Sequence, residues 1–228
     1  MNYIIPNWPA PSSIRAYTTL RTGFDERSEK PEIKNKALSG LFSLPSAPIW
    51  IKQVHSNTVI EAIPAHLAHI ADASFTDTPN RICVILTADC LPIFVCNKQG
   101  TQVAAIHAGW RGLAAGIIEN TIKQMQQPSD ELLIWLGPAI GPSRFEVGLD
   151  VYQAFTQHDT HAEQAFTPCA PNKWLANLYQ LAALRLKSLG ITQIYGGDFC
   201  TYSQPEMFFS YRRDKGDTGR MASLIWIA

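Results

Sequence analysis

The sequence predicts an α+β fold built as one domain over residues 1–228, and two of its patterns support this. Short apolar runs of the length expected of buried strands recur along the chain, and two longer segments repeat their apolar residues at helical spacing. Several strand-like runs follow one another without a helix between them, which favours α+β over a regular βαβ repeat. The composition, 46% hydrophobic and 17% charged, is that of an ordinary globular protein.

The expected strands are apolar and rich in β-branched residues. Four of them cover residues 49–54, 82–86, 102–106 and 132–136. Three more are expected near the C-terminus, at residues 191–195, 207–211 and 222–227. Because residues 25–36 (DERSEKPEIKNK) form the most charged stretch, we expect a surface loop there.

Two segments have the spacing of amphipathic helices. Residues 113–125 repeat apolar side chains at three- and four-residue steps, which predicts a helix. Residues 174–189 carry a clearer stripe of leucine and alanine. Gly190 follows this second segment, where a helix C-terminal cap is expected.

Charge and cysteine content exclude several classes of protein. The 19 Lys and Arg balance the 19 Asp and Glu, and no basic tract suggests nucleic acid or an anionic membrane as a partner. No apolar run approaches the roughly 18–20 residues of a membrane span, and the N-terminus lacks the pattern of a signal peptide. An odd number of cysteines, five, favours reduced thiols, so we expect a cytoplasmic protein.

Three short motifs, each directly after a strand-like run, carry candidate chemistry. They are KQVH ending at His55, TADC ending at Cys90, and HAGWRG beginning at His107. If the strands are neighbours, these three side chains can converge. Two imidazoles and one thiolate suit Zn²⁺, and three protein ligands leave a fourth position open for catalysis. Asp89 is the candidate acid/base beside Cys90.

The residue types alone leave a plainer interpretation open. A cysteine or histidine after a strand is commonly a packed core residue, and the spacings match no short zinc motif. Arg111 lies in a glycine-rich loop that leads into a helix N-terminus, which favours an anion but also fits a surface turn. Arg212, Arg213 and Arg220 form a second basic cluster that also fits a solvated loop.

Taken together and in order, the motifs resemble one family. The chain contains KQVH, ADAS (71–74), TADCLPI, AAIHAGWRG, LGPAIGPSRFEVG, CTYS and FFSYRRDKGDTGRMA. This series resembles the polyphenol-oxidase/laccase-domain family, also called the YfiH-like family, from about Trp50 to the C-terminus. The N-terminal IIPNWPAP looks like enterobacterial-type members. Members have been described as multicopper oxidases and later as purine nucleoside phosphorylases.

The resemblance implies an α/β/β/α sandwich with Zn²⁺ held by His55, Cys90 and His107, Cu²⁺ being the less favoured metal. It implies phosphorolysis of adenosine, inosine, guanosine and methylthioadenosine, with adenosine deamination, so that the partners are a nucleoside and phosphate. Cys90, Asp89 and His107 are then the expected catalytic residues. Arg21 matches a family arginine near phosphate or substrate, and Arg111 and Arg212 are further candidates for that role.

One departure from the family bears on the substrate. A stretch of the type GG…SLNLG.H.GD usually follows the arginine that Arg21 matches, whereas RTGF here runs directly into DERSEKPEIKNKAL. That stretch can border the pocket, so its loss affects the expected substrate but leaves the three metal ligands intact.

Three other functions compete with nucleoside chemistry. Some enterobacterial-type relatives are implicated in removing a wrong amino acid, L-Ser, from a UDP-MurNAc peptidoglycan precursor, with Cys90 and His107 as nucleophile and base or through zinc hydroxide. Copper-dependent polyphenol oxidation ranks lower, because the paired HxH and HCH motifs are missing and six histidines are few. A binding module with a structural metal would need a fourth ligand, for which Cys83, Cys96 and Cys200 are candidates by type.

Overall fold

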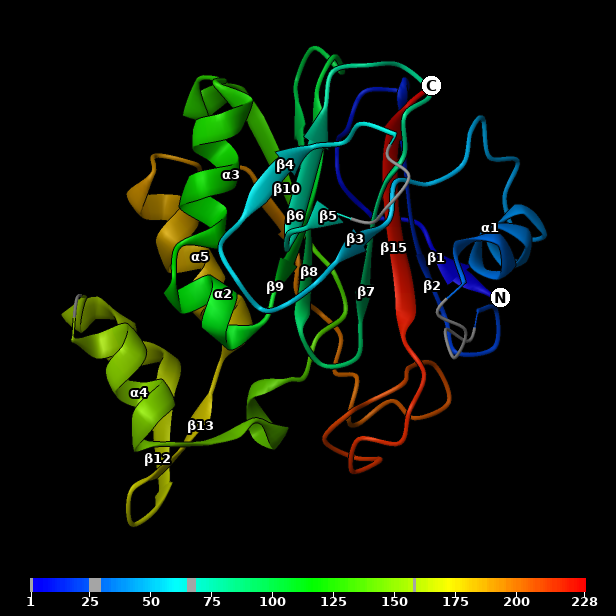
Figure 1. The fold of residues 1–228 in the computed structure, drawn as a ribbon. Helices are drawn as coiled ribbons and strands as arrows, with labels where there is room; N and C mark the ends of the chain where they lie inside the picture. The colour runs from blue at the N-terminus through cyan, green and yellow to red at the C-terminus, as the bar shows by residue number, and fades with distance from the viewer. Residues whose placement is uncertain (1, 25–29, 65–68, 158) are drawn as a thin grey trace.

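Two β-sheets packed face to face form the centre of the computed structural model, which describes residues 2–24, 30–64, 69–157 and 159–228 (Figure 1). The larger sheet contains β4 (Val59–Glu61), β6 (Ala73–Thr76), β8 (Leu91–Asn97), β9 (Val103–Ala108), β10 (Leu132–Leu136) and β14 (Ile194–Gly196). Its strand order is β14-β10-β8-β9-β6-β4. The smaller sheet contains β1 (Tyr3–Ile4), β2 (Ile14–Thr19), β7 (Cys83–Thr87) and β15 (Met221–Ile227), in the order β1-β2-β15-β7.

Apolar side chains on the facing sides of the two sheets form one part of the core. Ile85 and Ile225 from the smaller sheet are buried in the same cluster as Phe94 and Trp135 from the larger one. The rings of Phe94 and Trp135 stack with centroids 5.4 Å apart. Because side chains alternate along a strand, the other face of each sheet is also apolar and needs a cover.

Helices provide that cover on both outer faces. On the larger sheet lie α3 (Ile117–Met125) and α5 (Leu178–Ser188), whose apolar stripes pack on alternate residues of β8 and β9. On the smaller sheet, Leu38 of α1 (Pro31–Ser39) packs with Val84 and Leu224. Figure 1 shows α1 on one side of the paired sheets and α3 and α5 on the other. The expected α+β class and the α/β/β/α sandwich are therefore confirmed.

The remaining elements lie at the edges of this sandwich. The helical ones are α2 (Trp110–Ala114), α4 (Leu149–Thr156) and the 3₁₀ turns Ser129–Glu131, Pro142–Arg144 and Thr160–Ala165. A three-stranded sheet is made of β11 (Glu146–Gly148), β13 (Lys173–Ala176) and β12 (Phe166–Ala170). A two-stranded parallel sheet joins β3 (Ile51–Lys52) to β5 (His69–Ile70).

Both expected helices are shorter than their apolar spacing indicated. The segment 113–125 is divided between α2 and α3, because Gly116 takes φ +90 and so breaks the helix between them. The segment 174–189 begins in β13, and α5 starts only after Asn177, whose side chain accepts a hydrogen bond from the Gln180 N–H as an N-terminal cap. Gly190 takes φ +80 beyond the last turn, as the expected cap requires.

Two other predictions about local structure are wrong. The expected loop 25–36 lies partly outside the described residues, and from Pro31 onward it is helix α1, with proline in the first turn where its missing N–H costs nothing. Residues 207–211 form turns and irregular backbone rather than a strand, and the N–H groups of Met207 and Phe208 bond back to the Gln204 carbonyl.

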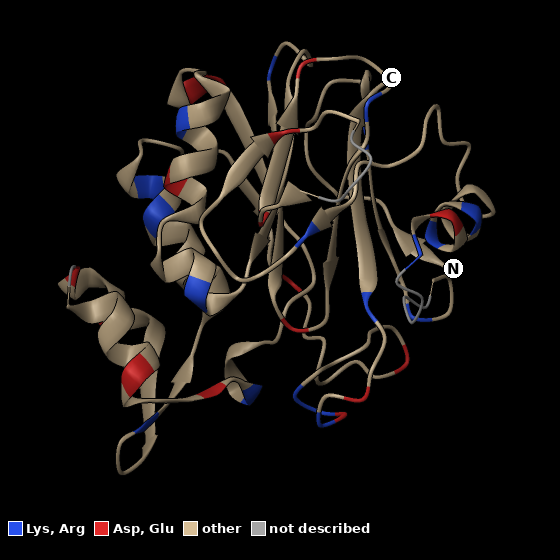
Figure 2. Ribbon diagram, in the orientation of Figure 1, with Lys and Arg blue, Asp and Glu red and all other residues tan. Residues whose placement is uncertain are grey.

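Charged residues lie mainly on the helices and loops, and the paired sheets carry few of them (Figure 2). Both signs also occur in the loop that precedes β15. Within the described part of the chain, no helix is long and apolar enough to cross a membrane.

Candidate functional site

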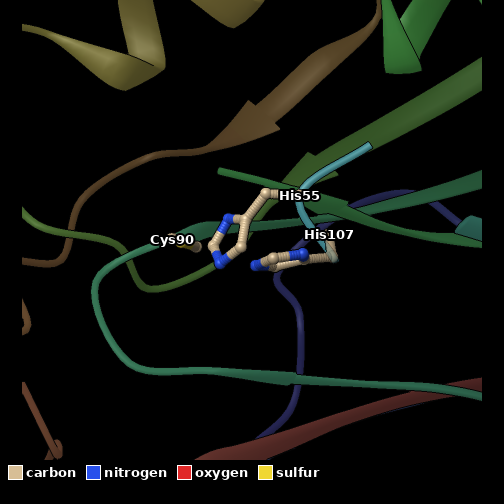
Figure 3. A group of neighbouring side chains, drawn as sticks. All are labelled: His55, Cys90 and His107. Atoms are coloured by element: carbon tan, nitrogen blue, oxygen red, sulfur yellow. The ribbon is translucent and has the colours of Figure 1, made fainter. Parts of the chain in front are cut away.

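Three predicted metal ligands meet at one end of the paired sheets (Figure 3). His55 lies in the loop after β3, Cys90 in the turn between β7 and β8, and His107 within β9. One ligand atom from each of them lies within 4.8 Å of those of the other two. The two imidazole centroids are also 4.8 Å apart. The structure thus brings together side chains separated by 35 and 17 positions.

Strand register explains why Cys90 and His107 are neighbours. Strands β8 and β9 pair antiparallel, with Leu91 opposite Ala108 and Pro92 opposite His107. Cys90 immediately precedes Leu91, so the hairpin places its thiol beside the His107 ring. Because antiparallel register is fixed by the alternation of buried residues, this proximity follows from the fold itself.

Asp72 brings the third ligand to the other two. Its carboxylate accepts the N–H groups of Val54, His55 and Ser56 at 3.3, 2.9 and 2.6 Å, and the Ser56 hydroxyl at 2.7 Å. It also bonds Nδ1 of His107 at 2.8 Å, while its own backbone carbonyl accepts the His107 N–H. Asp72 is fully buried. One carboxylate therefore positions two of the three ligands.

The charges of these groups depend on one another. Burial raises the pKa of the Cys90 thiol, but the charge and hydrogen bonding of His107 outweigh burial and leave that pKa below its usual value. Burial lowers the pKa of His107, but the Cys90 thiolate and Asp72 raise it above the usual value by more. The two shifts in pKa have opposite directions, and both favour the charged forms of Cys90 and His107.

These residues fit a metal ion. Thiolate and neutral imidazole are the ligands that Zn²⁺ prefers, with bonds of about 2.0–2.3 Å. The Asp72 bond to Nδ1 leaves Nε2 of His107 for a metal, an arrangement common around metal-ligating histidines. Cys83, Cys96 and Cys200 do not join the cluster in the described ranges, so they do not supply the fourth ligand of a closed structural site.

Asp89 lines the same site, and its carboxylate is held from two directions. The hydroxyl of Thr201 donates to Oδ1 at 2.6 Å, and the backbone N–H of Arg212 donates to Oδ2 at 2.7 Å. Asp89 takes φ +84 and His55 takes φ +61, a region that residues other than glycine seldom occupy. Such backbone strain persists only where surrounding contacts hold it, and it is common at functional sites.

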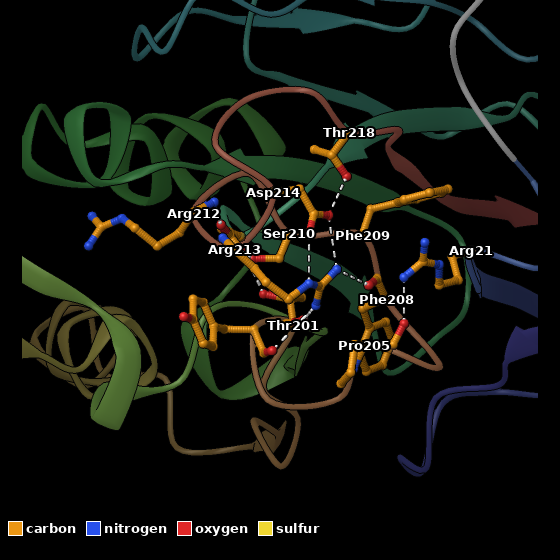
Figure 4. A network of polar contacts seen from close by, with 12 residues as sticks. Arg21, Thr201, Pro205, Phe208, Phe209, Ser210, Arg212, Arg213, Asp214 and Thr218 are labelled. Carbon is orange, nitrogen blue, oxygen red and sulfur yellow. Dashed lines mark hydrogen bonds and ion pairs between the residues drawn. The ribbon is translucent and has the colours of Figure 1, made fainter.

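Arg213 supports the partners of Asp89 (Figure 4). Its guanidinium donates to the carbonyls of Thr201 and Phe208 and forms an ion pair with Asp214, whose nearest nitrogen–oxygen distance is 2.8 Å. These contacts join two loops that carry the Thr201 hydroxyl and the Arg212 N–H. Arg213 therefore has a structural role, because its guanidinium bonds groups of the protein itself and holds the two loops together.

A cavity of about 580 Å³ opens beside the three ligands and Asp89. Its walls combine aromatic rings with cations, which suits a planar, polar ligand that carries negative charge. The aromatic residues are Trp110, Phe145 and Tyr211, and the cationic ones are Lys34, Lys52, Arg212 and Arg220.

The three arginines expected at the substrate occupy different places. Arg212 lines the cavity, where its guanidinium packs over Phe145 and donates to the Glu146 carbonyl. Arg21 does not line it, and bonds the Pro205 carbonyl at 2.6 Å. Arg111 is exposed and stacks on Trp110 with its guanidinium carbon 4.3 Å from the ring centroid. The substrate roles of Arg21, Arg111 and Arg212 remain predictions.

Several residues at the site were missed by residue-type reasoning. Asp72 sits within the ADAS motif, and Thr201 within CTYS, but neither motif indicated a role for them. Lys52 is the first residue of KQVH, a motif in which only His55 was given a role. Their only signal was membership of a motif in the ordered series, because Asp72 and Thr201 act through partners distant in sequence.

Replacing Asp72 by asparagine should weaken metal binding by about 10–100-fold, since it loosens two ligands at once. Zinc affinity measured by competition with a chromogenic chelator tests this. Asp159→Asn is the matched control, because Asp159 also bonds a histidine ring, at 3.0 Å, but on the exposed surface. Equal zinc affinities for wild type and Asp72→Asn would contradict the assigned role.

The same carboxylate should make the metal-free protein sensitive to acid. Burial raises the pKa of Asp72, but hydrogen bonds from His107 and Ser56 lower it to about 2, below its ordinary 3.8. A pKa depressed by folding contributes stability above about pH 4 that is lost as the pH falls towards 2. Urea unfolding between pH 2 and 6 should show wild type and Asp72→Asn converging at low pH. A difference in unfolding free energy between the two proteins that does not change with pH would refute a contribution from the ionised Asp72 carboxylate.

Gly109 should be required for the metal centre on steric grounds. A Cβ at Gly109 would lie 2.7 Å from Nδ1 of His55 and 3.0 Å from Sγ of Cys90. Its φ of −64° suits alanine, so Gly109→Ala should displace the ligands without straining the backbone. We expect a loss of zinc affinity of at least about 10-fold. Gly40→Ala, with a nearest contact of 3.3 Å, is the control; unchanged affinity in Gly109→Ala would exclude the contact.

Comparison with known proteins identifies the family of this chain. A family model described as multi-copper polyphenol oxidoreductase laccase matches residues 12–228. The chain is 45% identical to "Purine nucleoside phosphorylase YfiH" of Escherichia coli (strain K12), over 98% of both chains. It is 44% identical to a purine nucleoside phosphorylase of Haemophilus influenzae, over 99% of both chains.

A solved structure is similar over the same extent. The crystal structure of a Neisseria meningitidis protein superposes with a TM-score of 0.93 at 41% identity, covering 100% of this chain and 99% of that one. The resemblance inferred from the motifs is therefore confirmed, and the chain belongs to the multi-copper polyphenol oxidoreductase laccase family, also called YfiH-like.

Proposed function

We propose that this protein is a zinc-dependent purine nucleoside phosphorylase that also deaminates adenosine. The observation that carries the proposal is the convergence of His55, Cys90 and His107 at a cavity that also holds Asp89. Relatives at 44–45% identity over nearly the whole chain are named purine nucleoside phosphorylases, which supports the same reaction here.

The cavity suits a nucleoside in size and in surface. Its volume of about 580 Å³ is in the range of small-molecule sites, about 300–1,000 Å³. Trp110, Phe145 and Tyr211 offer ring faces and edges against which a flat purine can pack. Asp89 adds a carboxylate that can meet the polar edge of the base or the ribose.

In phosphorolysis, a phosphate oxygen attacks the anomeric carbon while the glycosidic bond breaks and its electron pair leaves with the purine. The departing base needs a proton, and we assign its transfer to the Asp89 carboxyl, which Thr201 and the Arg212 N–H hold in place. A bound zinc ion would supply a Lewis acid and, for deamination, hydroxide at neutral pH.

The donor set does not by itself separate zinc from copper, because Cu²⁺ binds most nitrogen and sulfur sites more tightly. The described residues contain a single cluster of three metal-ligating side chains, whereas a multicopper oxidase needs several coupled copper sites. One mononuclear site with a thiolate suits hydrolytic or transfer chemistry at zinc, which is the metal we propose.

Product analysis tests the function directly. Zinc-loaded protein incubated with adenosine should give adenine and ribose-1-phosphate only when phosphate is present, and inosine without it. Cys90→Ala should lose both products because it removes a metal ligand. Chromatography of the products with and without phosphate measures each reaction separately.

Cys169→Ala is the matched control, since Cys169 is an exposed free cysteine outside the cluster and should keep both activities. Absence of both products above the Cys90→Ala background would reject nucleoside chemistry. Release of serine from a UDP-MurNAc–serine conjugate would then identify the amidase reaction instead.

A further inference from the structure

Two of the cations that line the cavity, Lys52 and Arg220, can be compared with cations elsewhere in the protein that pair with acidic side chains. Arg81, Lys98 and Arg185 each pair with a glutamate, at nitrogen–oxygen distances of 3.6, 3.9 and 2.6 Å. In the described part of the chain, the side chains of Lys52 and Arg220 form no ion pair. Both line the cavity.

Neighbouring groups leave the charge of both side chains uncompensated. Arg220 donates only to the backbone carbonyls of Thr218 and Gly219, and its guanidinium lies 5.7 Å from the centroid of Tyr211. Lys52 is exposed on β3. Asp89 is the one carboxylate among the described residues that line the cavity, and it forms an ion pair with neither Lys52 nor Arg220.

Strand register places Lys52 and Arg220 at the same rim. Gln53, next to Lys52, is fixed to β7 by two hydrogen bonds of 2.8 Å, one to each backbone polar group of Leu86. The next residue of β7, Thr87, pairs across the sheet with Met221, which directly follows Arg220. The end of β7 thus has Lys52 beside it on one side and Arg220 on the other.

Thr87 gives an independent sign of a missing partner at this rim. Thr87 is among the residues that line the cavity and is 1% exposed, and its buried hydroxyl has no hydrogen-bond partner among the described residues. A buried hydroxyl without a partner is costly, and most such groups in proteins are satisfied. A small anion seated at the end of β7 would present oxygens to the two cations, and a turn of the Thr87 side chain would bring its hydroxyl to the same anion.

We propose that Lys52, Arg220 and Thr87 form the subsite for inorganic phosphate, the co-substrate in phosphorolysis. This assignment rests on the proposed function for its role in the reaction, but it concerns a binding property that can be measured without turnover. Phosphate held there lies in the same cavity as the metal ligands and Asp89. Two unpaired cations that line one cavity add their potentials there and attract a dianion more strongly than a single surface cation.

Binding of inorganic phosphate to zinc-loaded protein, followed by isothermal titration calorimetry, tests the subsite. Lys52→Glu should weaken phosphate binding at least about 10-fold, because it removes a charge-assisted contact and adds repulsion. Lys52→Arg should bind within about threefold of wild type, since the charge remains. Thr87→Val, which keeps the side-chain shape, should weaken binding by a smaller factor. Lys123→Glu, on the exposed surface of α3, is the control.

Kinetics separate this subsite from the proposed function. If wild type carries out phosphorolysis, Lys52→Glu should raise the KM for phosphate at least about 10-fold and change the KM for adenosine less than about twofold. An unchanged KM for phosphate would overturn the subsite while leaving the function standing. If wild type shows no phosphorolysis, weakened phosphate binding by Lys52→Glu still supports the subsite, and unchanged binding overturns it.

Adenosine 5′-monophosphate distinguishes free phosphate from the phosphate of a nucleotide. We expect it to compete with inorganic phosphate no better than adenosine does. Tight binding of the nucleotide that is lost in Lys52→Glu, together with no measurable binding of inorganic phosphate to wild type, would overturn the assignment to the co-substrate.

Discussion

The arrangement of the site depends on one buried carboxylate. Asp72 accepts three consecutive N–H groups from the loop that carries His55 and also bonds Nδ1 of His107. An anion buried without such donors would be strongly unfavourable, so the loop and the ring must adopt the positions that satisfy it. The unusual φ of +61 at His55 is maintained by the same contacts. The Asp72 carboxylate therefore determines three features together: the positions of two candidate ligands, the orientation of the His107 ring, and the conformation of the loop that carries His55.

The two sheets make this carboxylate effective because they hold its neighbours in fixed register. Strand β9 pairs with β8 on one side, which places Cys90 beside His107, and with β6 on the other, which places Asp72 there. The side chains of β8 and β9 are buried along their whole length, so a shift of one residue would expose an apolar row. The packing of the core thus keeps the candidate metal ligands at a fixed spacing, although the core residues do not bind the metal themselves.

The sequence indicated that the three candidate ligands converge, because each directly follows or ends a recognisable strand. It predicted the sandwich only through the family resemblance, since apolar runs do not reveal which strands pair. Prediction from the sequence failed where a local pattern of apolar residues continued through a point at which the chain changes its structure. Apolar periodicity continued across Gly116 and Asn177, where the chain breaks its helices, and FFSY resembled a strand although turns around Arg213 hold it. Asp72 and Thr201 were missed because their roles depend on partners 35 and 112 positions away.

Charge distribution links the metal centre to the rest of the cavity. Arg213 is a cation near the cavity, as Lys52 and Arg220 are, but it has partners within the protein. Its guanidinium pairs with Asp214 and donates to three backbone carbonyls, and these contacts hold two loops together. Arg220, seven positions later, meets only neutral carbonyls. A cation kept without an acidic partner at a cavity raises the positive potential there at a cost to folding, because like charges repel. Since neither Asp89 nor another described carboxylate pairs with Lys52 or Arg220, an anion from solution is the partner that we propose for the rim at the end of β7.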